Sequence, residues 1–136
     1  MKNNNCIFCQ IIRGEIPCHK VYEDENCLAF LDIHPIREGH ILVVPKKHTP
    51  DFYDLIDDDF VKLMLAVKKI AEKVNEELRP LKTGIMTMGF DVPHAHIHIV
   101  PMQETTDITS KVLLEEKTAS PIAKELQSMA EKLKLS

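Results

Sequence analysis

The alternation of apolar and polar positions is clearest between Val92 and Pro101, where three histidines alternate with alanine and isoleucine. A period of two residues with a proline near each end is typical of a short β-strand. Successive side chains on a strand point to opposite faces, so His94, His96 and His98 are predicted to share one face. Three bases on one face would weaken a core strand unless a ligand, a metal ion or a reaction used them.

A second period, of three to four residues, runs through positions 60–78. It puts apolar side chains on one stripe and lysines and glutamates on the rest, which predicts an amphipathic helix packed on the core. Three aspartates at 57–59 offer an N-cap and negative charge for the first turn, and Pro80 ends the helix. A last helix is expected from about 121 to 133, with a proline in its first turn.

The remaining predicted elements are short. A helical segment at 7–13 is closed by Gly14. Five or so strands joined by short loops and interrupted by one long helix predict an α+β fold with an antiparallel sheet. Neither a regular βαβ alternation nor a Gly-rich phosphate loop is present. Besides the histidine strand, strands are expected at 20–22, 27–31, 40–45 and 83–88, the last pairing antiparallel with the histidine strand, and a further strand is possible at 111–114.

Length and charge narrow the function classes. A chain of 136 residues fits one domain spanning 1–136, large enough to bury a core without disulfides. With 17 basic and 21 acidic residues and a net charge of -4, there is no basic surplus to indicate a nucleic acid partner, so any phosphate-bearing partner is expected to be small. No signal peptide or membrane span is visible, which predicts a cytoplasmic protein without a membrane partner.

The four cysteines are Cys6, Cys9, Cys18 and Cys27. In a reducing compartment structural disulfides are not expected, and the C-x-x-C spacing of the first two suits a metal site or a redox pair. A redox role would need a helix start beside a βαβ unit, which the pattern lacks. The other two are expected to be ordinary small side chains.

The middle histidine is the natural nucleophile. A histidine can attack when one ring nitrogen donates its proton to a fixed acceptor and the other directs its lone pair at the substrate. Attack of His96 on phosphorus would give a phosphohistidine intermediate that water then cleaves. His98 could hold the phosphate oxygens or shuttle a proton. The alternative for each histidine alone is a structural side chain with its hydrogen bonds satisfied.

These motifs resemble the histidine-triad (HIT) superfamily of nucleotide hydrolases and transferases. The resemblance rests on the stretch 28–33, the stretch 39–48 and His94-x-His96-x-His98, in that order along the chain, and it covers the chain from position 6 to about 101. It implies a HIT-like sheet-based fold, usually a homodimer. It also implies binding of a purine nucleotide or nucleotide conjugate and cleavage of the bond to the leaving group.

Carried over by position, the resemblance implies that His96 takes the nucleotidyl group and that His98 and His40 lie around the phosphate. The carbonyl of His94 would accept the proton of the nucleophile, and Asp32 would accept hydrogen bonds from two ribose hydroxyls. The resemblance also implies that six apolar residues line the pocket for the base: Ile7, Phe8, Ile11, Phe30, Ile33 and Leu42. The alternative role for these residues is plain core packing.

The resemblance also implies a structural zinc ion, because the N-terminal C-x-x-C is typical of zinc-containing members. Its ligands would be Cys6, Cys9, His48 and His94. Two thiolates and two imidazoles make a closed tetrahedral set, which leaves no open position for catalysis. The alternative is four side chains without a metal ion.

Two features bear on the substrate. The stretch 86–93 is shorter and less polar than the Asn and Gly-Gln-Ser type turn of many family hydrolases. The third histidine, His98, is retained, which favours hydrolysis over transfer to a sugar phosphate. We therefore expect hydrolysis of nucleoside 5'-phosphoramidates or related adenylylated substrates through a nucleotidyl intermediate on His96. The alternatives are a dinucleoside polyphosphate hydrolase of the fragile-histidine-triad type and a zinc-stabilised nucleotide-binding module with little catalysis.

Overall fold

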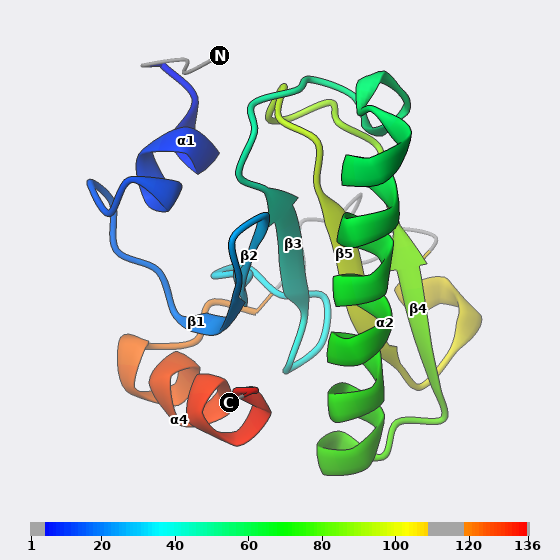
Figure 1. The fold of residues 1–136 in the computed structure, drawn as a ribbon. Coiled ribbons are helices and arrows are strands. Elements are labelled where there is room, and N and C mark those ends of the chain that lie inside the picture. Colours follow the sequence, from blue (N-terminus) through cyan, green and yellow to red (C-terminus); the bar gives the residue numbers. More distant parts are fainter. Residues whose placement is uncertain (1–4, 109–118, 136) are drawn as a thin grey trace.

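The computed structural model describes residues 5–108 and 119–135, which form one antiparallel sheet with helices on both of its faces. The strand order is β1-β2-β3-β5-β4, and the long helix α2 runs lengthwise in front of β5 and β4 (Figure 1). This confirms the predicted five-stranded α+β architecture. The elements are α1 (Ile7–Ile12), β1 (Lys20–Glu23), β2 (Cys27–Leu31), β3 (Ile41–Pro45), η1 (Phe52–Asp54), α2 (Asp57–Leu78), β4 (Lys82–Met86), β5 (Ile97–Met102), η2 (Thr105–Asp107) and α4 (Ala123–Leu133).

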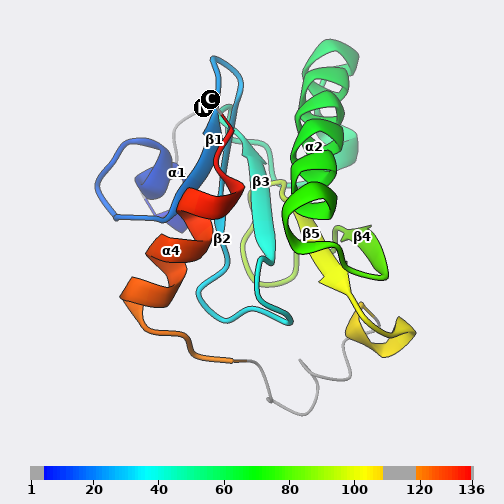
Figure 2. The same ribbon diagram turned by 90° about the horizontal axis from the view of Figure 1, so that it is seen from below.

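The two central strands β2 and β3 are buried on both faces, so their side chains divide between two cores. Ala29 and Val43 face the larger core, which α2 and α4 cover. Phe30 and Leu42 face a smaller core that α1 closes from the other side. In the view from below, α1 and α4 lie beside the β1–β2 end of the sheet and α2 lies over β3 and β5 (Figure 2). The smaller core is the one that positions the site.

The helices follow the apolar pattern, and their ends differ from the prediction in small ways. The N-cap of α2 is Ile56, so the aspartates 57–59 fill the first turn without capping it. Arg79 ends the helix in the left-handed conformation, with φ of 48°, before Pro80. The last helix begins at Ala123, two residues later than expected, because Pro121 and Ile122 precede the first helical turn.

The predicted histidine strand is wrong at its start, because β5 begins only at Ile97. Before it, His94 N–H donates to Val92 O at 2.8 Å and Ala95 N–H donates to Thr49 O at 2.7 Å, so these residues turn instead of joining the ladder. The predicted alternation of faces still holds, since Ala95, Ile97 and Ile99 all lie in the larger core.

The neighbouring strand β4 pairs antiparallel with β5 as predicted, but it ends at Met86 and not at position 88. The strand expected at 111–114 lies outside the described residues. Among the described residues, no helix combines the length and the apolar composition that crossing a membrane requires.

Candidate active site and metal centre

The three histidines of the alternating segment lie side by side in the smaller core. His94 and His96 are buried, and His98 is half-buried at the start of β5. The ring of Phe8, from α1, meets both buried histidines edge-on, with centroids 5.9 Å from His94 and 5.1 Å from His96. The rings of His96 and His98 lie 5.0 Å apart. The structure thus brings together the side chains that the sequence placed on one face.

His96 has the hydrogen bond that a nucleophilic imidazole needs. Its Nδ1 lies 2.7 Å from the backbone carbonyl of His94. Because a carbonyl can only accept, Nδ1 carries the proton, and in the neutral ring the lone pair resides on Nε2. That nitrogen has no hydrogen-bond partner within 5–108 and 119–135. An electrophile placed beside it would meet a lone pair held in a fixed direction.

His40 and His98 form a hydrogen-bonded pair at one edge of this cluster. His40 Nε2 lies 2.9 Å from His98 Nδ1, and the Ile36 N–H donates to His40 Nδ1 at 3.1 Å. Burial lowers the pKa of His40 to about 4. Burial, and secondarily the neighbouring His40 and His96, lower the pKa of His98 to about 4. Both rings are therefore neutral at pH 7.

Asp32 follows the end of β2 and turns back toward this pair. Its Oδ1 accepts from the His34 N–H at 2.8 Å, and its Oδ2 lies 3.7 Å from His40 Nε2. Burial raises the pKa of the Asp32 carboxyl. The carboxylate keeps acceptor capacity beyond these contacts, which is the property that binding of ribose hydroxyls requires.

The residues matched to the base pocket divide into two groups. Phe8, Phe30 and Leu42 are buried together in the smaller core, and the two phenylalanine rings meet edge-on at 5.7 Å. Ile11 packs against them and is half-buried. Ile7 and Ile33 are 44% and 56% exposed. Of the buried group, Phe8 packs against His94 and His96, and the two exposed isoleucines present apolar surface to solvent.

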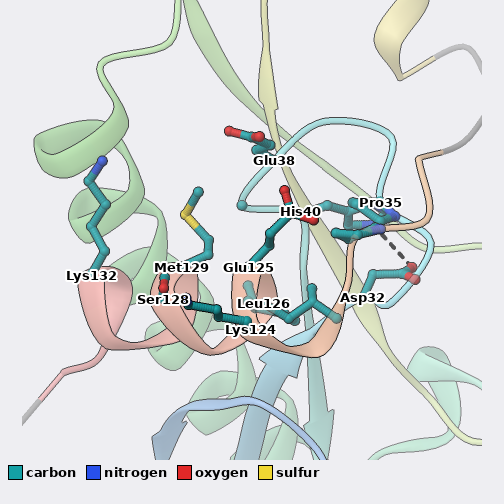
Figure 3. A pocket seen from close by; sticks show the side chains of 13 residues that line it. Asp32, Pro35, Glu38, His40, Lys124, Glu125, Leu126, Ser128, Met129 and Lys132 are labelled. Carbon is teal, nitrogen blue, oxygen red and sulfur yellow. Dashed lines mark ion pairs between the residues drawn. The ribbon is translucent and has the colours of Figure 1, made fainter.

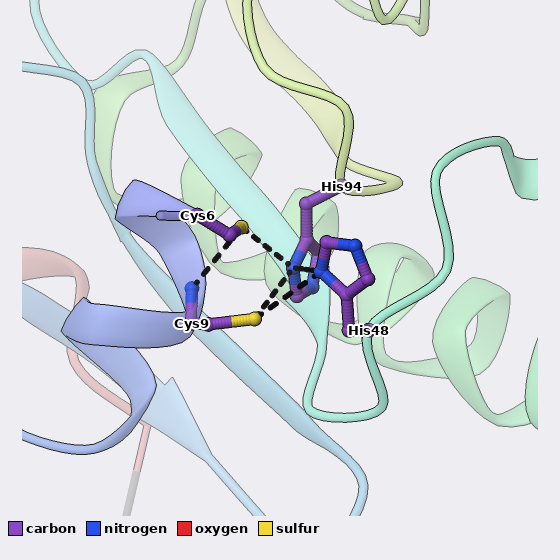
Figure 4. Close-up of side chains that lie close together, drawn as sticks. All are labelled: Cys6, Cys9, His48 and His94. Atoms are coloured by element: carbon purple, nitrogen blue, oxygen red, sulfur yellow. Dashed lines mark hydrogen bonds between the residues drawn. The ribbon is translucent and has the colours of Figure 1, made fainter. Parts of the chain in front are cut away.

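Cys6, Cys9, His48 and His94 converge on one point from three separate parts of the chain (Figure 4). His94 Nδ1 lies 3.3 Å from Cys6 Sγ and 3.5 Å from Cys9 Sγ, and His48 Nδ1 lies 3.2 Å from both Cys9 Sγ and His94 Nδ1. A zinc ion with ordinary bond lengths holds its tetrahedral ligand atoms about 3.3–3.8 Å apart. The four side chains therefore fit a tetrahedral metal ion.

The surroundings of the cluster fit a metal ion as well. His94 Nε2 donates to the backbone carbonyl of Pro45 at 2.8 Å, which leaves the Nδ1 lone pair pointing at the thiols. Burial raises the pKa of the Cys6 thiol, whereas coordination to a cation would favour the thiolate. All four cysteines of the chain are free thiols.

A separate cavity of about 380 Å³ lies between the loop after β2 and the helix α4 (Figure 3). It shares Asp32 and His40 with the histidine cluster, and Leu126 and Met129 supply apolar lining from α4. Neither His96 nor His98 lines it. A substrate phosphorus atom in this cavity would not face the free nitrogen of His96.

Some of the groups that hold the histidine rings in place belong to the backbone, so residue type alone does not identify them. The carbonyl of Pro45 and the N–H of Ile36 each fix one histidine ring. The carbonyl of His94, which does the same for His96, was implied by the family resemblance. One residue that the motifs also left out, Asp51, lines a small hollow of about 40 Å³ beside His96. No spacing or periodicity in the sequence singles these groups out.

Comparison with known proteins gives one consistent match. The family model described as HIT domain matches residues 13–105. "Protein hit" of Bacillus subtilis is 45% identical over 104 residues, which cover 71% of this chain and 70% of that protein. Adenosine 5'-monophosphoramidase hnt1 of Schizosaccharomyces pombe is 39% identical over 98 residues, covering 71% of this chain and 74% of that protein.

Solved structures give the same match for the fold. A Hit-like protein from Bartonella henselae superposes with a TM-score of 0.82 and 32% identity, covering 98% of this chain and 97% of that one. A zinc-bound histidine triad family protein from Mycobacterium smegmatis superposes with a TM-score of 0.74 and 32% identity, covering 95% of this chain and 90% of that one.

Proposed function

This chain belongs to the HIT domain family, and from that premise we propose that it is a nucleotide hydrolase whose nucleophile is His96. The observation that carries the proposal is the 2.7 Å hydrogen bond from His96 Nδ1 to the His94 carbonyl. It leaves Nε2 as a directed lone pair, and the His96 ring lies 5.0 Å from His98, whose partner His40 is 3.7 Å from the Asp32 carboxylate.

The reaction proceeds in two displacements. His96 Nε2 forms a bond to phosphorus, the bond to the leaving group breaks with its electron pair, and the leaving atom takes up a proton from solvent. Water then attacks phosphorus, the nitrogen–phosphorus bond breaks, its electron pair returns to Nε2, and the proton of the water passes to solvent. Throughout, the His94 carbonyl holds the Nδ1 proton and stabilises the positive ring of the intermediate.

The neighbouring side chains bind the nucleotide around this nitrogen. His98 donates to a phosphate oxygen, Asp32 accepts from the ribose hydroxyls, and the base lies against Ile7 and Ile33 over the buried Phe8. We assign His40 a positioning role, because both of its ring nitrogens already have partners, Ile36 N–H and His98.

Nucleoside 5'-phosphoramidates are the proposed substrates. The name of the S. pombe relative, an adenosine 5'-monophosphoramidase, supports this class. Dinucleoside polyphosphates are the alternative class, since the same nucleophile would cleave a phosphoanhydride. The second alternative is a zinc-stabilised nucleotide-binding module with little catalysis, which a metal ion bound directly at His96 or His98 would favour.

Replacement of His96 by asparagine tests the nucleophile. We expect turnover of adenosine 5'-phosphoramidate to fall at least about 1000-fold, because the amide of asparagine has no nucleophilic nitrogen to attack phosphorus. The affinity for AMP should stay within a few-fold of the parental value, since the proposed nucleoside contacts Asp32, Ile7 and Ile33 are unchanged. Turnover at the parental rate would rule out His96, and a parent that binds AMP but cleaves neither phosphoramidate nor diadenosine polyphosphate would favour the binding module.

The metal proposed for the four-residue cluster is structural zinc. The ligand set of two thiolates and two imidazoles suits zinc, and a zinc-bound relative supports the assignment. When bound, the ion would hold α1 against His48 and against the segment that carries His94 and His96. It would thereby fix the carbonyl that faces the nucleophile.

A homodimer and a cytoplasmic location are also proposed. Val61 and Leu65 lie four residues apart on α2 and are 51% and 61% exposed, and Ile85 on β4 is 48% exposed. A second copy of the chain would cover these apolar side chains. Light scattering after gel filtration should give twice the chain mass, and a monomer at micromolar concentration would contradict the dimer.

A further inference from the structure

We propose that the backbone N–H of Ile36 is a positioning group that fixes the tautomers of His40 and His98. Through these tautomers it gives His98 a hydrogen-bond donor for the phosphate and keeps the cluster of Asp32, His40 and His98 closed to divalent metal ions. The role assigned to His98 rests on the proposed hydrolase function, whereas the tautomers and the metal exclusion stand on the hydrogen bonds alone.

The direction of one hydrogen bond determines the rest. An amide N–H can only donate, so His40 Nδ1, 3.1 Å from Ile36 N, must accept and carries no proton. The single proton of the neutral His40 ring is therefore on Nε2. This nitrogen lies 2.9 Å from His98 Nδ1, which must in turn accept. The proton of the neutral His98 ring is thus on Nε2.

His98 Nε2–H is then the free end of a chain of three donors. It has no protein acceptor among residues 5–108 and 119–135, and the half-buried ring lies next to His96. A donor in this position meets the oxygens of a phosphorus atom that His96 attacks. Protonation of His98 on Nδ1 would set two N–H groups against each other, which agrees with its lowered pKa. His98 therefore acts as a neutral donor and not as a proton shuttle.

The same hydrogen bonds oppose a metal ion. Asp32, His40 and His98 offer three ligand atoms within 4.8 Å of one another, a spacing that suits a divalent cation. A cation at His40 Nε2 would need the lone pair there, so the proton would move to Nδ1 and face the Ile36 N–H. Metal-binding histidines ordinarily donate from the other nitrogen to an acceptor, as His94 does to Pro45. His40 has the opposite arrangement.

The loop holds this N–H in place. The Ile36 side chain is buried, and the loop closes on itself through His40 N–H donating to Arg37 O at 3.0 Å. Arg37 Nε pairs with the buried Asp107 carboxylate at 3.0 Å, which ties the loop to η2. The Ile36 N–H therefore cannot turn away from His40 without breaking these contacts.

Nitrogen-15 NMR of histidine-labelled parent protein at pH 7 tests the tautomers directly. We expect His40 and His98 to show a protonated Nε2 and an unprotonated Nδ1, with a coupling across the hydrogen bond from His40 Nε2 to His98 Nδ1. A proton on Nδ1 of either residue would overturn the proposal. This measurement needs neither a variant nor turnover.

The variant Ile36→Pro removes the N–H and keeps an apolar residue, and Ile36→Val keeps the N–H. Zinc-saturated protein freed of excess metal is titrated with Ni²⁺ while AMP binding is followed. Ile36→Pro, which lacks the N–H, should bind Ni²⁺ about 10–100-fold more tightly than the parent, and this Ni²⁺ should compete with AMP. Ile36→Val should bind Ni²⁺ as the parent does. Adding Asp32→Asn to Ile36→Pro should remove the gained site.

Equal Ni²⁺ affinity in parent and a folded Ile36→Pro variant would overturn the metal exclusion. If Ile36→Pro does not fold, the proposal is tested on the parent protein by its NMR spectrum and its Ni²⁺ affinity. A tight Ni²⁺ site at His40 and His98 in the parent would contradict the proposal. Failure of the hydrolase function would show as absent turnover with the expected tautomers still in place.

Discussion

His94 and His40 are the two most deeply buried histidines, and they differ in what their second nitrogen meets. Both are at most 1% exposed, and burial lowers the pKa of each to about 4. His94 donates to the Pro45 carbonyl and directs a lone pair at two thiols, whereas His40 accepts from the Ile36 N–H and directs a proton at His98. Residue type and burial are the same, so one backbone group separates the proposed metal ligand, His94, from the proposed positioning residue, His40.

His94 also connects the Cys6–Cys9–His48–His94 cluster with the proposed nucleophile, His96. Its ring belongs to the cluster with Cys6 and Cys9, and its carbonyl accepts the Nδ1 proton of His96. Phe8 packs edge-on against both His94 and His96. A metal ion at the thiols would therefore stabilise the proposed nucleophile without touching it, and variants on either side of His94 test this link.

The largest effect should come from Cys6→Ser. We expect metal content to fall from about one ion per chain to below a tenth, because a thiolate ligand is lost. At a metal concentration about 1000-fold above the parental Kd, this removes about 4 kcal/mol of stability. Elemental analysis and thermal unfolding measure both effects. Cys18→Ser, outside the cluster, should keep the metal, and unchanged metal content in Cys6→Ser would contradict the site.

The pH dependence of stability should come next in size. Unfolded His40 takes up a proton near pH 6.5, but the folded ring resists it down to about pH 4. Its contribution is therefore complete above pH 6.5 and is lost as the pH falls toward 4, by up to about 3 kcal/mol. Urea unfolding between pH 7 and 4.5 should show a shallower decline for His40→Gln than for the parent. The exposed control His34→Gln should decline as the parent does; equal slopes for all three would refute the assignment.

A smaller effect is expected from Asp32→Asn, which removes the charge that we propose accepts ribose hydroxyls. KM for an adenosine 5'-phosphoramidate should rise about tenfold, the size of one lost charge-assisted hydrogen bond. The 2'-deoxy substrate should lose less, since it offers one hydroxyl fewer. Steady-state kinetics with both substrates measures the difference, and equal losses would argue against a ribose contact.

The smallest effect is expected from Phe8→Leu. The change keeps apolar volume but removes the edge-on ring contacts to the two histidines, at a cost of about 1 kcal/mol in unfolding free energy. Denaturant unfolding measures it, with Phe90→Leu as control because Phe90 is 90% exposed. A Phe8 effect no larger than that of the control would show that the ring does not couple the two regions.

Much of the fold could be predicted from the sequence, because period and burial agree along most of the chain. The stripe of α2 and the doubly apolar strands β2 and β3 lie where the pattern indicated. The start of β5 could not be predicted. The alternation through His94 and Ala95 is that of a strand, but Ala95 N–H bonds to Thr49 O, a partner far away in sequence.

In the candidate site, too, backbone hydrogen bonds set what the sequence could not predict. The sequence motifs identified the residues that converge, Cys6 with His94 and His40 with His98 among them. They could not assign the ring protons of His40 and His94, since these depend on the Ile36 N–H and the Pro45 carbonyl, backbone groups that no motif marks. For His40 the motifs predict a phosphate contact, and the partners of its two ring nitrogens lead us to propose a positioning role.

The most direct test of the account is to trap the intermediate. Protein mixed with an adenosine 5'-phosphoramidate and quenched in alkali within one turnover should carry one adenylyl group, and peptide mass spectrometry should locate it on His96. An adenylyl group on another histidine, or unlabelled protein during rapid turnover, would contradict a nucleophile prepared by the His94 carbonyl.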